Sequence, residues 1–593
     1  MHVEAIDWAI IIAFFVLTLG IGAAVARRAG ASSAEFFAAG RSMPWWLLGV
    51  SMVATTFGAD TPLLVTQFVR ERGVAGNWEW WAFLLSGMLT VFVYARLWQR
   101  AGILTDIEFY ELRYSGSSAS FLRGFRAIYI GVLFNLFIMA SVSLAAMKIG
   151  SVLLGLTPVE TLLIAGTVTV IYSSLGGLRG VVITDCVQFV LAMGGAIGAA
   201  VVALQHPDVG GMTGLLAHPA LQDKIALLPD FSATNALMAV FIIPLAVQWW
   251  ATWYPGAEPG GGTFIAQRML AAKSEDHAVG AALLFNVAHY ALRPWPWIIV
   301  ALASLVVFPD VESIQDAFPQ AHGVAANDMA YPAMLTFLPA GLMGLVLASL
   351  IAAYMSTIST LLNLGSSYVV HDFYHRFVRP DCSEKNLVRA GRFCTVALMV
   401  LSCILALFME SALANFEIIL QIGAGTGLLF ILRWFWWRIN AWSEIAAMVI
   451  SFTVAGYFQF VHTRIGMPEM EGWQTLVINV GITTVGWLAT TYLTPPTTDA
   501  CLTRFYEKIR PGGPGWEAPR HRLGWKPASE LGRSWAVPHG ILCMFLGCAM
   551  IYSLLFATGN WLYGRHLLAT ILTLLALASA GALFHCWKRV ASS

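Results

Sequence analysis

Long apolar stretches follow one another along most of the chain, and this feature constrains the fold more than any other. A helix needs about 20 predominantly apolar residues to cross the hydrocarbon core of a bilayer. Only 11% of the residues are charged, whereas a soluble domain carries about 25%, so there is too little charge to cover a water-facing surface. The sequence therefore predicts an all-α polytopic membrane protein with about fifteen spanning helices, at residues 6–27, 44–70, 76–100, 121–153, 158–177, 181–204, 232–270, 277–308, 331–371, 388–410, 412–435, 438–461, 472–494, 537–557 and 562–588.

Basic residues are concentrated on alternate loops, which sets the expected orientation because Lys and Arg prefer cytoplasmic loops. With the amino terminus outside, the inner loops hold most of the Lys and Arg, and the longest, 495–536, is strongly basic. The outer loop 309–330 has no Lys or Arg, and the outer exceptions are Arg70, Arg72, Lys224, Arg464 and Arg565. We therefore predict an amino terminus outside and a carboxyl terminus inside. The first stretch lacks a basic leader, so we expect a retained helix rather than a signal peptide.

Composition argues against several classes of function. A net charge of +1 gives no global field that would attract nucleic acid. The eight cysteines include no CxxC pair and the thirteen histidines show no metal-ligand spacing, so we expect neither disulfides nor zinc. Without HExxH, GxSxG or GxxxxGK[ST], a membrane-embedded enzyme and ATP-driven transport are both disfavoured. Loop 495–536 is too short for an appended signalling domain, which disfavours a sensor.

Two apolar stretches are interrupted at membrane depth. The first contains Gly58, Asp60 and Pro62, and the second, 249–263, contains two prolines and four glycines. Irregular backbone is tolerated in a bilayer only where it is buried in protein or lines a polar cavity. The interruptions lie five stretches apart, so each opens a five-helix unit, and an odd number of spans inverts the second unit. This pattern is typical of secondary transporters with a site near the midplane, although two ordinary proline kinks remain the alternative.

Adjacent hydroxyl residues occur in the middle of the ninth stretch. Ser356 and Thr357 follow Ala353 by about one turn, so its carbonyl lies along the same helix face. Several neutral oxygens of this kind suit a sodium ion, and carbonyls freed by the broken second stretch would add to them. The alternative is that both hydroxyls bond to carbonyls one turn earlier or hold helices together.

Four short motifs follow one another along the chain: Glu35-Phe-Phe-Ala-Ala-Gly-Arg-Ser42, the run 176–188, the run 267–273, and His371-Asp372-Phe-Tyr374. Together they resemble the sodium:solute symporter family, which includes galactose, proline and pantothenate carriers, and the resemblance covers about residues 6–440. It implies a LeuT-type fold of two inverted five-helix repeats and no enzymatic activity. It also implies sodium-driven uptake of a small organic solute without an organic cofactor, in the plasma membrane or a bacterial cytoplasmic membrane.

The resemblance also implies site residues. The family's sodium site corresponds here to Ala54, Phe57, Ala353, Ser356 and Thr357, with Phe57 contributing only its carbonyl. Asp185 is similar to the aspartate beside the inward sodium exit, and a helix-capping role would be compatible with this.

Substrate contacts are expected at residues that follow the two interruptions and begin the third stretch: Asp60, Thr61, Glu79, Trp253, Tyr254, Glu258 and Gln421. The Glu79 position is similar to the sugar-contacting glutamate of the galactose carriers, but it is also compatible with the outer headgroup level. The stretch 254–262 is longer and richer in glycine than in the sugar carriers, which weakens the alignment there. Carboxylates and aromatic rings suit a sugar or polyol, and equally an amino acid or amine, so both stay open.

These features predict an extra helix and loop at 1–43, a first repeat at 44–204, an outer loop at 205–231, an inverted repeat at 232–435, and extra helices at 436–593. The alternative function is a sodium-independent carrier on the same fold.

Overall fold

The computed structural model describes residues 3–29, 39–103, 105–173, 178–251, 259–319, 326–526 and 535–591. Over these residues the chain is helical and no strand is present. By length and composition, ten helices in the described part are able to cross a membrane, or eleven if one bent pair counts as a single span. The prediction of an all-α polytopic protein is therefore confirmed, while the number fifteen stays a prediction.

The bent pair is α3 (Trp45–Thr55) with α4 (Asp60–Arg72). The ten long spans are η2 to α7 (Val74–Ala101), α9 to η6 (Gly116–Leu154), α12 (Leu178–Gln205), α17 to α18 (Glu275–Val307), α21 to η13 (Leu342–Val378), α22 (Glu384–Ala406), α25 (Ala441–Phe460), α26 (Gly472–Leu493), α29 (Val537–Leu562) and α30 (His566–Ala591). The other predicted stretches contain α1 (Ala5–Ala29), α11 (Pro158–Ser173), α14 (Thr234–Leu237), α15 (Ile243–Ala246), α16 (Thr263–Ala271), α23 (Ala412–Ala424) and α24 (Gly427–Leu432).

The predicted stretch 331–371 is divided in the structure. The short helix α20 (Ala330–Leu335) ends early, and α21 begins only at Leu342. Pro339 has no backbone donor, and Gly341 has a φ of 83°, which residues with a side chain rarely adopt. These two residues set the start of the helix that carries Ser356 and Thr357.

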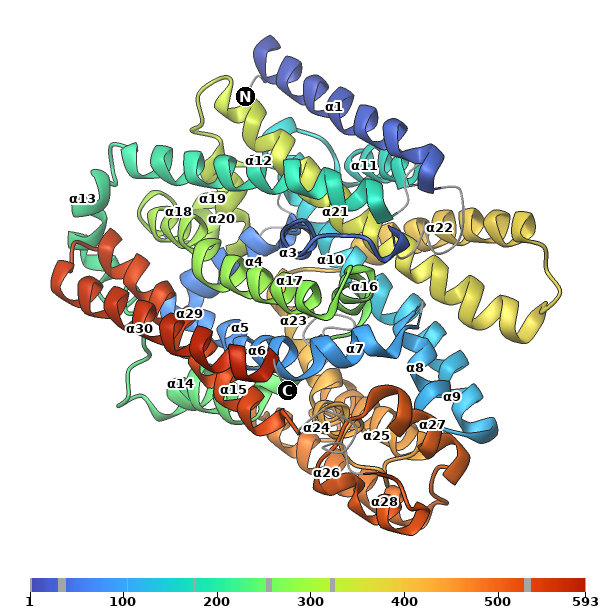
Figure 1. Ribbon diagram of the computed structural model, residues 1–593. Coiled ribbons are helices and arrows are strands. Elements are labelled where there is room, and N and C mark those ends of the chain that lie inside the picture. Colours follow the sequence, from blue (N-terminus) through green and yellow to red (C-terminus); the bar gives the residue numbers. More distant parts are fainter. Residues whose placement is uncertain are drawn as a thin grey trace.

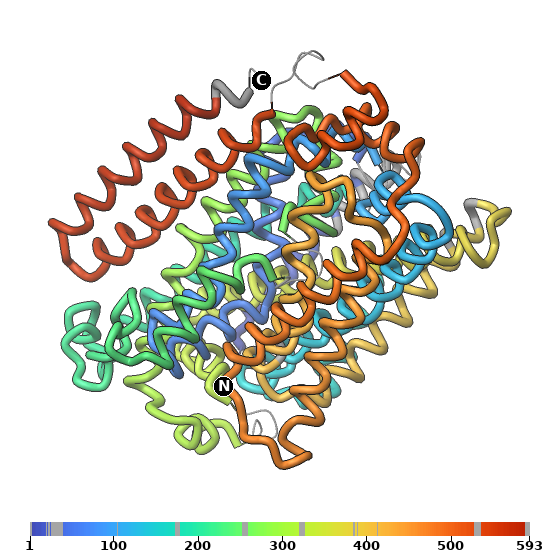
Figure 2. The backbone as a smooth tube through the Cα atoms, turned by 90° about the horizontal axis from the view of Figure 1, so that it is seen from below, coloured from blue at the N-terminus to red at the C-terminus, as the bar shows by residue number. Residues whose placement is uncertain are grey.

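Helices α3, α12 and α21 pack against one another, and α1 lies against both α12 and α21 (Figure 1). The carboxyl-terminal hairpin of α29 and α30 lies at an edge of the bundle in both views (Figures 1 and 2). Its helix α29 packs on α6 (Leu84–Leu89), where a β-carbon at Gly547 would approach the Met88 sulfur to 2.6 Å. Small residues allow such close helix contacts in membranes.

Several spans contain wide π-helical turns, which interrupt the regular α-helical hydrogen bonding. They are η3 (Thr90–Tyr94), η5 (Tyr129–Phe134), η6 (Gly150–Leu154), η8 (Met238–Ile242), η10 (Ala288–Leu292) and η13 (Tyr368–Val378). Two of these turns lie in spans that carry buried polar residues: the span of η10 contributes them to the centre of the bundle, and the span of η13 contributes them to its end.

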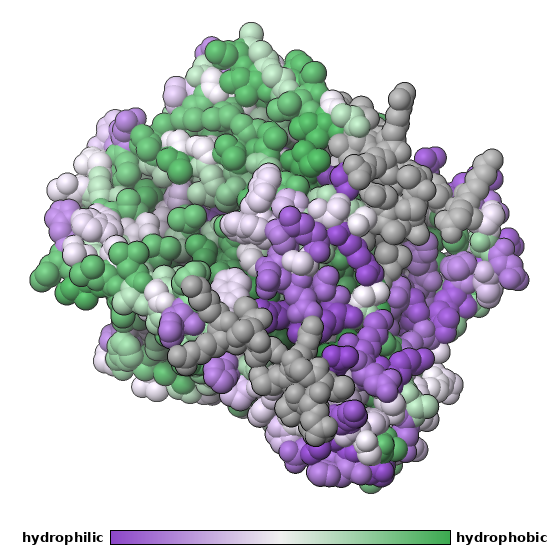
Figure 3. All heavy atoms as spheres, viewed as in Figure 1, coloured by the Kyte–Doolittle hydropathy of each residue, from purple (hydrophilic) through white to green (hydrophobic). Residues whose placement is uncertain are grey.

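The surface divides into an apolar and a polar part (Figure 3). Green, apolar atoms cover much of the side where α1 and α12 lie, and large apolar side chains such as Val190 and Leu567 are exposed there and on α30. Purple, polar atoms gather where α8 (Phe109–Arg113), α9 (Gly116–Ile128) and α27 (Asp499–Ile509) lie. An exposed apolar belt next to a polar end fits a protein embedded in lipid.

Three of the sequence motifs meet at one place. The backbone of Met43 exchanges hydrogen bonds with Ala271 and Lys273, both at 3.2 Å. Arg179 Nη2 donates to Ser42 Oγ at 2.8 Å. Contacts of Ser42 and of the adjacent Met43 therefore join the motif at 35–42 to those at 176–188 and 267–273.

Candidate functional site

The second span is broken at the predicted place. Helices α3 and α4 meet at a bend of 61°, and residues 56–59 connect them. The freed carbonyls receive hydrogen bonds from side chains of distant spans: Thr357 Oγ1 donates to the Thr55 carbonyl at 3.0 Å, and Arg293 Nη1 donates to the Thr56 carbonyl at 2.6 Å. Such replacement partners allow non-helical backbone to persist inside a membrane protein.

Ser356 and Asp185 are in direct contact. Ser356 Oγ donates to Asp185 Oδ1 at 2.6 Å, and Ser51 Oγ donates to Asp185 Oδ2 at 2.6 Å. All three side chains are buried, so the aspartate joins the broken span to α21 through two hydroxyls. Ser51 Oγ also accepts a hydrogen bond from Arg268 Nε at 3.3 Å, whereas the lone pairs of Ser356 Oγ stay available to a cation because this hydroxyl donates its proton to Asp185.

Arg268 compensates part of the negative charge of this carboxylate. Its Nη2 lies 3.9 Å from Asp185 Oδ2 and donates to Thr55 Oγ1 at 3.3 Å. The arginine is fully buried, and an unpaired buried charge would be costly. Its position next to Asp185 and Thr55 means that the carboxylate is paired before any cation arrives.

The residues expected to bind sodium lie at the break and on the helix that faces it. Ala54 and Phe57 lie at the break, and Ala353 lies one turn before Ser356 and Thr357 on α21, which packs against α3. All five residues are buried. Backbone carbonyls at a broken helix together with hydroxyl oxygens form the donor set that suits a monovalent hard cation.

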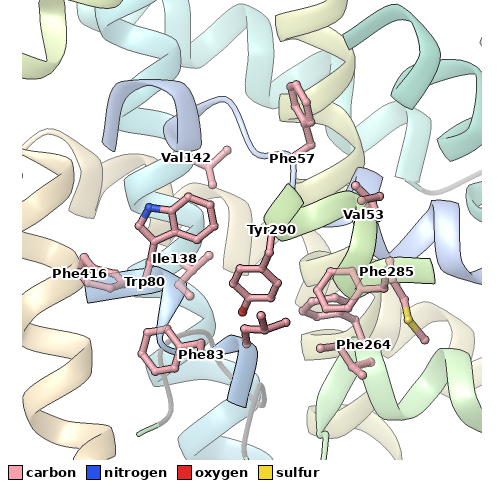
Figure 4. Packing of buried hydrophobic residues seen from close by; sticks show 14 of the residues in the cluster. Val53, Phe57, Trp80, Phe83, Ile138, Val142, Phe264, Phe285, Tyr290 and Phe416 are labelled. Carbon is pink, nitrogen blue, oxygen red and sulfur yellow. The ribbon is translucent and has the colours of Figure 1, made fainter. Parts of the chain in front are cut away.

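A cavity of about 70 Å³ lies on the other side of the break. Its polar wall contains Asp60, Thr61, His289 and Arg293, along with Thr56 and Ser141. Its apolar wall contains Trp80, Ile138, Phe416, Leu64, Val65 and Ile419. Figure 4 shows Trp80, Ile138 and Phe416 gathered together, with Tyr290 beside them. The cavity therefore has one apolar and one hydrogen-bonding wall.

Asp60 reaches back over the break. A β-carbon at Gly58 would collide with an Asp60 carboxylate oxygen and would lie 3.6 Å from Thr357 Oγ1. Asp60 and the Thr357 hydroxyl therefore both lie close to Gly58. Only glycine at position 58 leaves room for this arrangement.

Arg293 and His289 are site residues that our sequence reasoning missed. His289 Nδ1 lies 3.1 Å from Thr56 Oγ1, and Arg293 Nη1 lies 3.2 Å from the same atom. Both side chains are buried. A signal was present, since an arginine in an apolar stretch is expensive and indicates function by default. Ser51 and Thr55 were missed as well, and hydroxyls in an apolar helix carry no comparable signal.

Glu79 and Gln421 lie away from the small cavity. They line a second, larger cavity of about 1050 Å³ together with Gln248 and Glu417. Glu79 is buried and pairs with Arg72, which also contacts Glu417 Oε1 at 2.9 Å. The structure therefore brings Asp60 and Thr61 together, and Glu79 and Gln421 together, in two separate places. The predicted contacts Trp253, Tyr254 and Glu258 lie outside the described residues.

The chain has many relatives among known proteins. Residues 36–451 match the sodium:solute symporter family. A sodium/glucose cotransporter of Vibrio parahaemolyticus is 27% identical over 493 residues, which cover 79% of this chain and 87% of that protein. A sodium/myo-inositol cotransporter 2 of Oryctolagus cuniculus is 26% identical over 519 residues, which cover 80% of this chain and 73% of that protein.

A solved structure supports the same fold. The substrate-bound, outward-open state of a sodium-coupled sialic acid symporter superimposes with a TM-score of 0.64 at 20% identity, over 84% of this chain and 99% of that one. At this identity the likeness bears on the fold alone. The family match, however, extends over most of the chain, including the broken span and the helix with the two hydroxyls. This protein belongs to the sodium:solute symporter family.

Proposed function

We propose that this symporter couples inward sodium flow to the uptake of a neutral, polyhydroxylated solute such as a sugar or polyol. The family consists of transporters, so the chain is a sodium-coupled membrane transporter and not an enzyme. The observation that carries the proposal is the pair of consecutive carbonyls at the break. The Thr55 carbonyl accepts a hydrogen bond from Thr357 of α21, and the Thr56 carbonyl accepts one from Arg293, which lines the cavity.

This pair of carbonyls gives coupling a physical route. An ion that pulls Thr357 and the Thr55 region together fixes the backbone at the break. Arg293 is bound to the neighbouring Thr56 carbonyl. Fixing the backbone therefore also fixes the polar wall of the cavity, to which Arg293 belongs. A solute that binds this geometry favours the ion-bound state in return, since coupling between two sites is reciprocal.

For the ion, we assign Ala54, Phe57, Ala353, Ser356 and Thr357 as sodium ligands. The burial of all five residues and the packing of α3 on α21 support this assignment. We assign Asp185 to the sodium exit path, supported by its hydrogen bond to Ser356.

For the solute, charge balance favours a neutral compound. Asp60 alone would suit a cationic amine among aromatic rings. Arg293, however, lines the same cavity, is buried, and brings the opposite charge. Asp60, Thr61 and Arg293 would bind hydroxyl groups, while Trp80 would cover the apolar face of a ring. Known relatives named for glucose and myo-inositol point the same way.

Five further residues complete the proposed solute pathway. Glu79 and Gln421 line the larger cavity, where a solute would pass before reaching Asp60. Trp253, Tyr254 and Glu258 are proposed as contacts on the sequence resemblance alone. Transport would follow alternating access, with the second repeat inverted relative to the first.

For the topology, we propose fifteen spans with the amino terminus outside and the carboxyl terminus inside. The repeats would be 44–204 and 232–435, flanked by the regions 1–43, 205–231 and 436–593. The basic residues of loop 495–526 and the polar surface over α8, α9 and α27 support an inner location for this end.

The test is uptake by purified protein in proteoliposomes. Labelled myo-inositol, glucose, proline and choline would each be offered with an inward sodium gradient and with an equal potassium gradient. We expect accumulation of a polyol or sugar in sodium only. Accumulation of choline or proline instead would overturn the solute assignment, and equal uptake in both salts would indicate the sodium-independent carrier.

A further inference from the structure

The amino-terminal helix α1 contacts the two helices that carry the proposed cation site. It packs on α21, which carries Ser356 and Thr357, and on α12, which carries Asp185 (Figure 1). In the proposed organisation this helix lies outside both five-helix repeats. Nothing in the coupling route described above uses it, so its contacts with these two helices call for an explanation.

One carboxylate makes the strongest of these contacts. Asp7 is 1% exposed, and its Oδ1 accepts hydrogen bonds from the backbone N–H groups of Gly341 and Gly344, both at 2.7 Å. Its Oδ2 accepts from the backbone N–H of Glu4 at 2.9 Å, which fixes the carboxylate on its own helix. Every side-chain oxygen of Asp7 is therefore engaged.

These hydrogen bonds cap α21 from another helix. The first N–H groups of a helix lack partners within it, and a side chain at the cap position usually supplies one. Here the cap position is Gly341, which has no side chain to offer. A carboxylate from α1 takes this role, and its negative charge also complements the positive end of the helix dipole.

The backbones of α1 and α21 touch at the same point. A β-carbon at Gly344 would lie 2.5 Å from the Asp7 Cα and 2.9 Å from the Asp7 carbonyl oxygen. No other residue type fits at position 344 without displacing α1. The contact with Asp7 therefore fixes the position of α21 along its axis. It also provides an acceptor for the N–H groups at the start of the helix.

From this geometry we propose that Asp7 is a positioning residue for sodium binding, an inference that rests on the proposed sodium site. The helix α21 runs unbroken from Leu342 past Ser356, so a displacement at its start is transmitted along it. One residue of helix rises about 1.5 Å. A shift of that size would break the 2.6 Å hydrogen bond from Ser356 to Asp185 and the 3.0 Å bond from Thr357 to the Thr55 carbonyl.

A set of point variants tests the proposal in the full-length protein. Asp7→Ala removes the cap, and Asp7→Asn keeps an oxygen that is able to accept both N–H groups. Glu4→Ala is the matched control, because Glu4 is an exposed carboxylate on the same turn. The measurements are the half-saturating sodium concentration for uptake, equilibrium sodium binding followed by tryptophan fluorescence, and the melting temperature.

We expect Asp7→Ala to raise the half-saturating sodium concentration by about threefold or more, in line with the loss of a helix cap. The maximal rate per folded molecule should change less than the sodium dependence. Asp7→Asn should stay within about twofold of the wild type, and Glu4→Ala should be unchanged. If Asp7→Ala does not fold, Asp7→Ser serves instead, because its single, shorter hydroxyl cannot reach both N–H groups and should also raise the sodium requirement.

Two outcomes separate this inference from the proposed function. A lower melting temperature with an unchanged sodium dependence in Asp7→Ala, or in Asp7→Ser if that variant is used, would make Asp7 a purely structural cap and overturn the inference. Wild-type uptake that does not depend on sodium would instead overturn the proposed sodium site itself.

Discussion

The two ends of the bundle differ, because ion pairs link helices at one end and a large cavity lies at the other. At one end, Arg123 bridges Asp372 at 2.8 Å and Glu111 at 2.7 Å, and Arg376 contacts Glu111 at 2.6 Å. At the other end the cavity of about 1050 Å³ remains. Glu79 lies near the start of the span Val74–Ala101, and Glu111 lies shortly after its end. The two places are therefore at opposite ends of this helix.

The closed end is reinforced by a second connection. Arg100 donates to both carboxylate oxygens of Glu275, at 2.9 and 3.0 Å, and so ties α7 (Ala95–Ala101) to α17 (Glu275–Val287). At the open end the pair of Arg72 and Glu79 lines the cavity instead of filling it. These contacts motivate the hypothesis that the ion pairs hold one end closed while solute enters through the other.

The largest expected effect follows from removing the arginine at the closed end. In Arg123→Ala the carboxylate of Asp372, whose side chain is 0% exposed, loses its ionic partner. Breaking a buried pair costs about 3–5 kcal/mol, so the closed end should open and uptake should fall by more than about tenfold. A cysteine at Thr61 should then react with an impermeant thiol reagent added at the closed end.

A double variant provides the control for this prediction. The double variant Arg123→Ala with Asp372→Asn also removes the carboxylate charge that Arg123→Ala leaves without its partner. Part of the lost closure should therefore be recovered. If the cysteine at Thr61 reacts only from the open end in all variants, the ion pairs do not close the pathway.

Removing a hydroxyl from the cation site should have the next largest effect. Thr357→Ala deletes the oxygen that bonds to the Thr55 carbonyl at 3.0 Å. Loss of one such interaction costs about 1 kcal/mol, which corresponds to about a fivefold higher half-saturating sodium concentration. Solute affinity should fall only as far as it is coupled to sodium. Thr357→Ser keeps the oxygen and should be mild, and equal impairment of both variants would mean that the oxygen is not a ligand.

The open end should respond more weakly. In Glu79→Gln, Arg72 keeps its contact with Glu417, so we expect about a threefold higher solute KM, as for a partly exposed pair. A double-mutant cycle with Arg72→Ala separates two roles. If Glu79 acts only through Arg72, its substitution should have no further effect in the Arg72→Ala background, whereas a persistent rise in KM would make it a direct solute contact.

The smallest effect is expected for the partly exposed pair of Arg376 and Glu111. Arg376 has a side chain 44% exposed, and Glu111 keeps Arg123 when it is lost. Arg376→Ala should therefore lower the free energy of unfolding by less than about 1 kcal/mol. A shift as large as that of Arg123→Ala, measured by thermal unfolding, would contradict this ranking.

The same carboxylate fixes the pH dependence of this pair. Burial raises the pKa of Glu111, but the hydrogen bonds from Arg123 and Ser120 together with the charges of Arg123 and Arg376 lower it, and the net shift is downward. A lowered folded-state pKa means that the stabilisation is present above the ordinary Glu value of about 4.3 and is lost as the pH falls through the folded value. The effect of Arg376→Ala should thus be constant from about pH 6 to pH 8.

The sequence predicted what depends on local signals. Apolar length predicted the spans, and Gly58 with Pro62 predicted the break between α3 and α4, because both residues act on their own turn of helix. The contact of Ser356 with Asp185 joins residues 171 positions apart, and no local pattern reports such a distance. The roles assigned to these residues stay predictions until they are measured.

Some of the site was hidden for a different reason. Arg293 and His289 lie in an apolar stretch and were detectable as charged or titratable groups at membrane depth, but their target, the Thr56 carbonyl, exists only because the second span is broken. Gln421 and Asp60 were predicted for one pocket and lie in two cavities. Their separation depends on how the helices bend, and no local sequence pattern reports these bends.

The π-helical turns have a consequence for comparing relatives. Each wide turn accommodates one more residue than an α-helical turn, so the side chains beyond it are rotated by about 100° relative to a regular helix. In the span Leu342–Val378 the turn η13 begins after Ser367 and contains Asp372. A relative that lacks one residue there would direct a different side chain at Arg123, and an ungapped alignment would pair residues that are rotated by about 100° from each other around the helix. Loss or gain of a single codon is therefore a way for evolution to exchange the partner of Arg123 without substituting any residue.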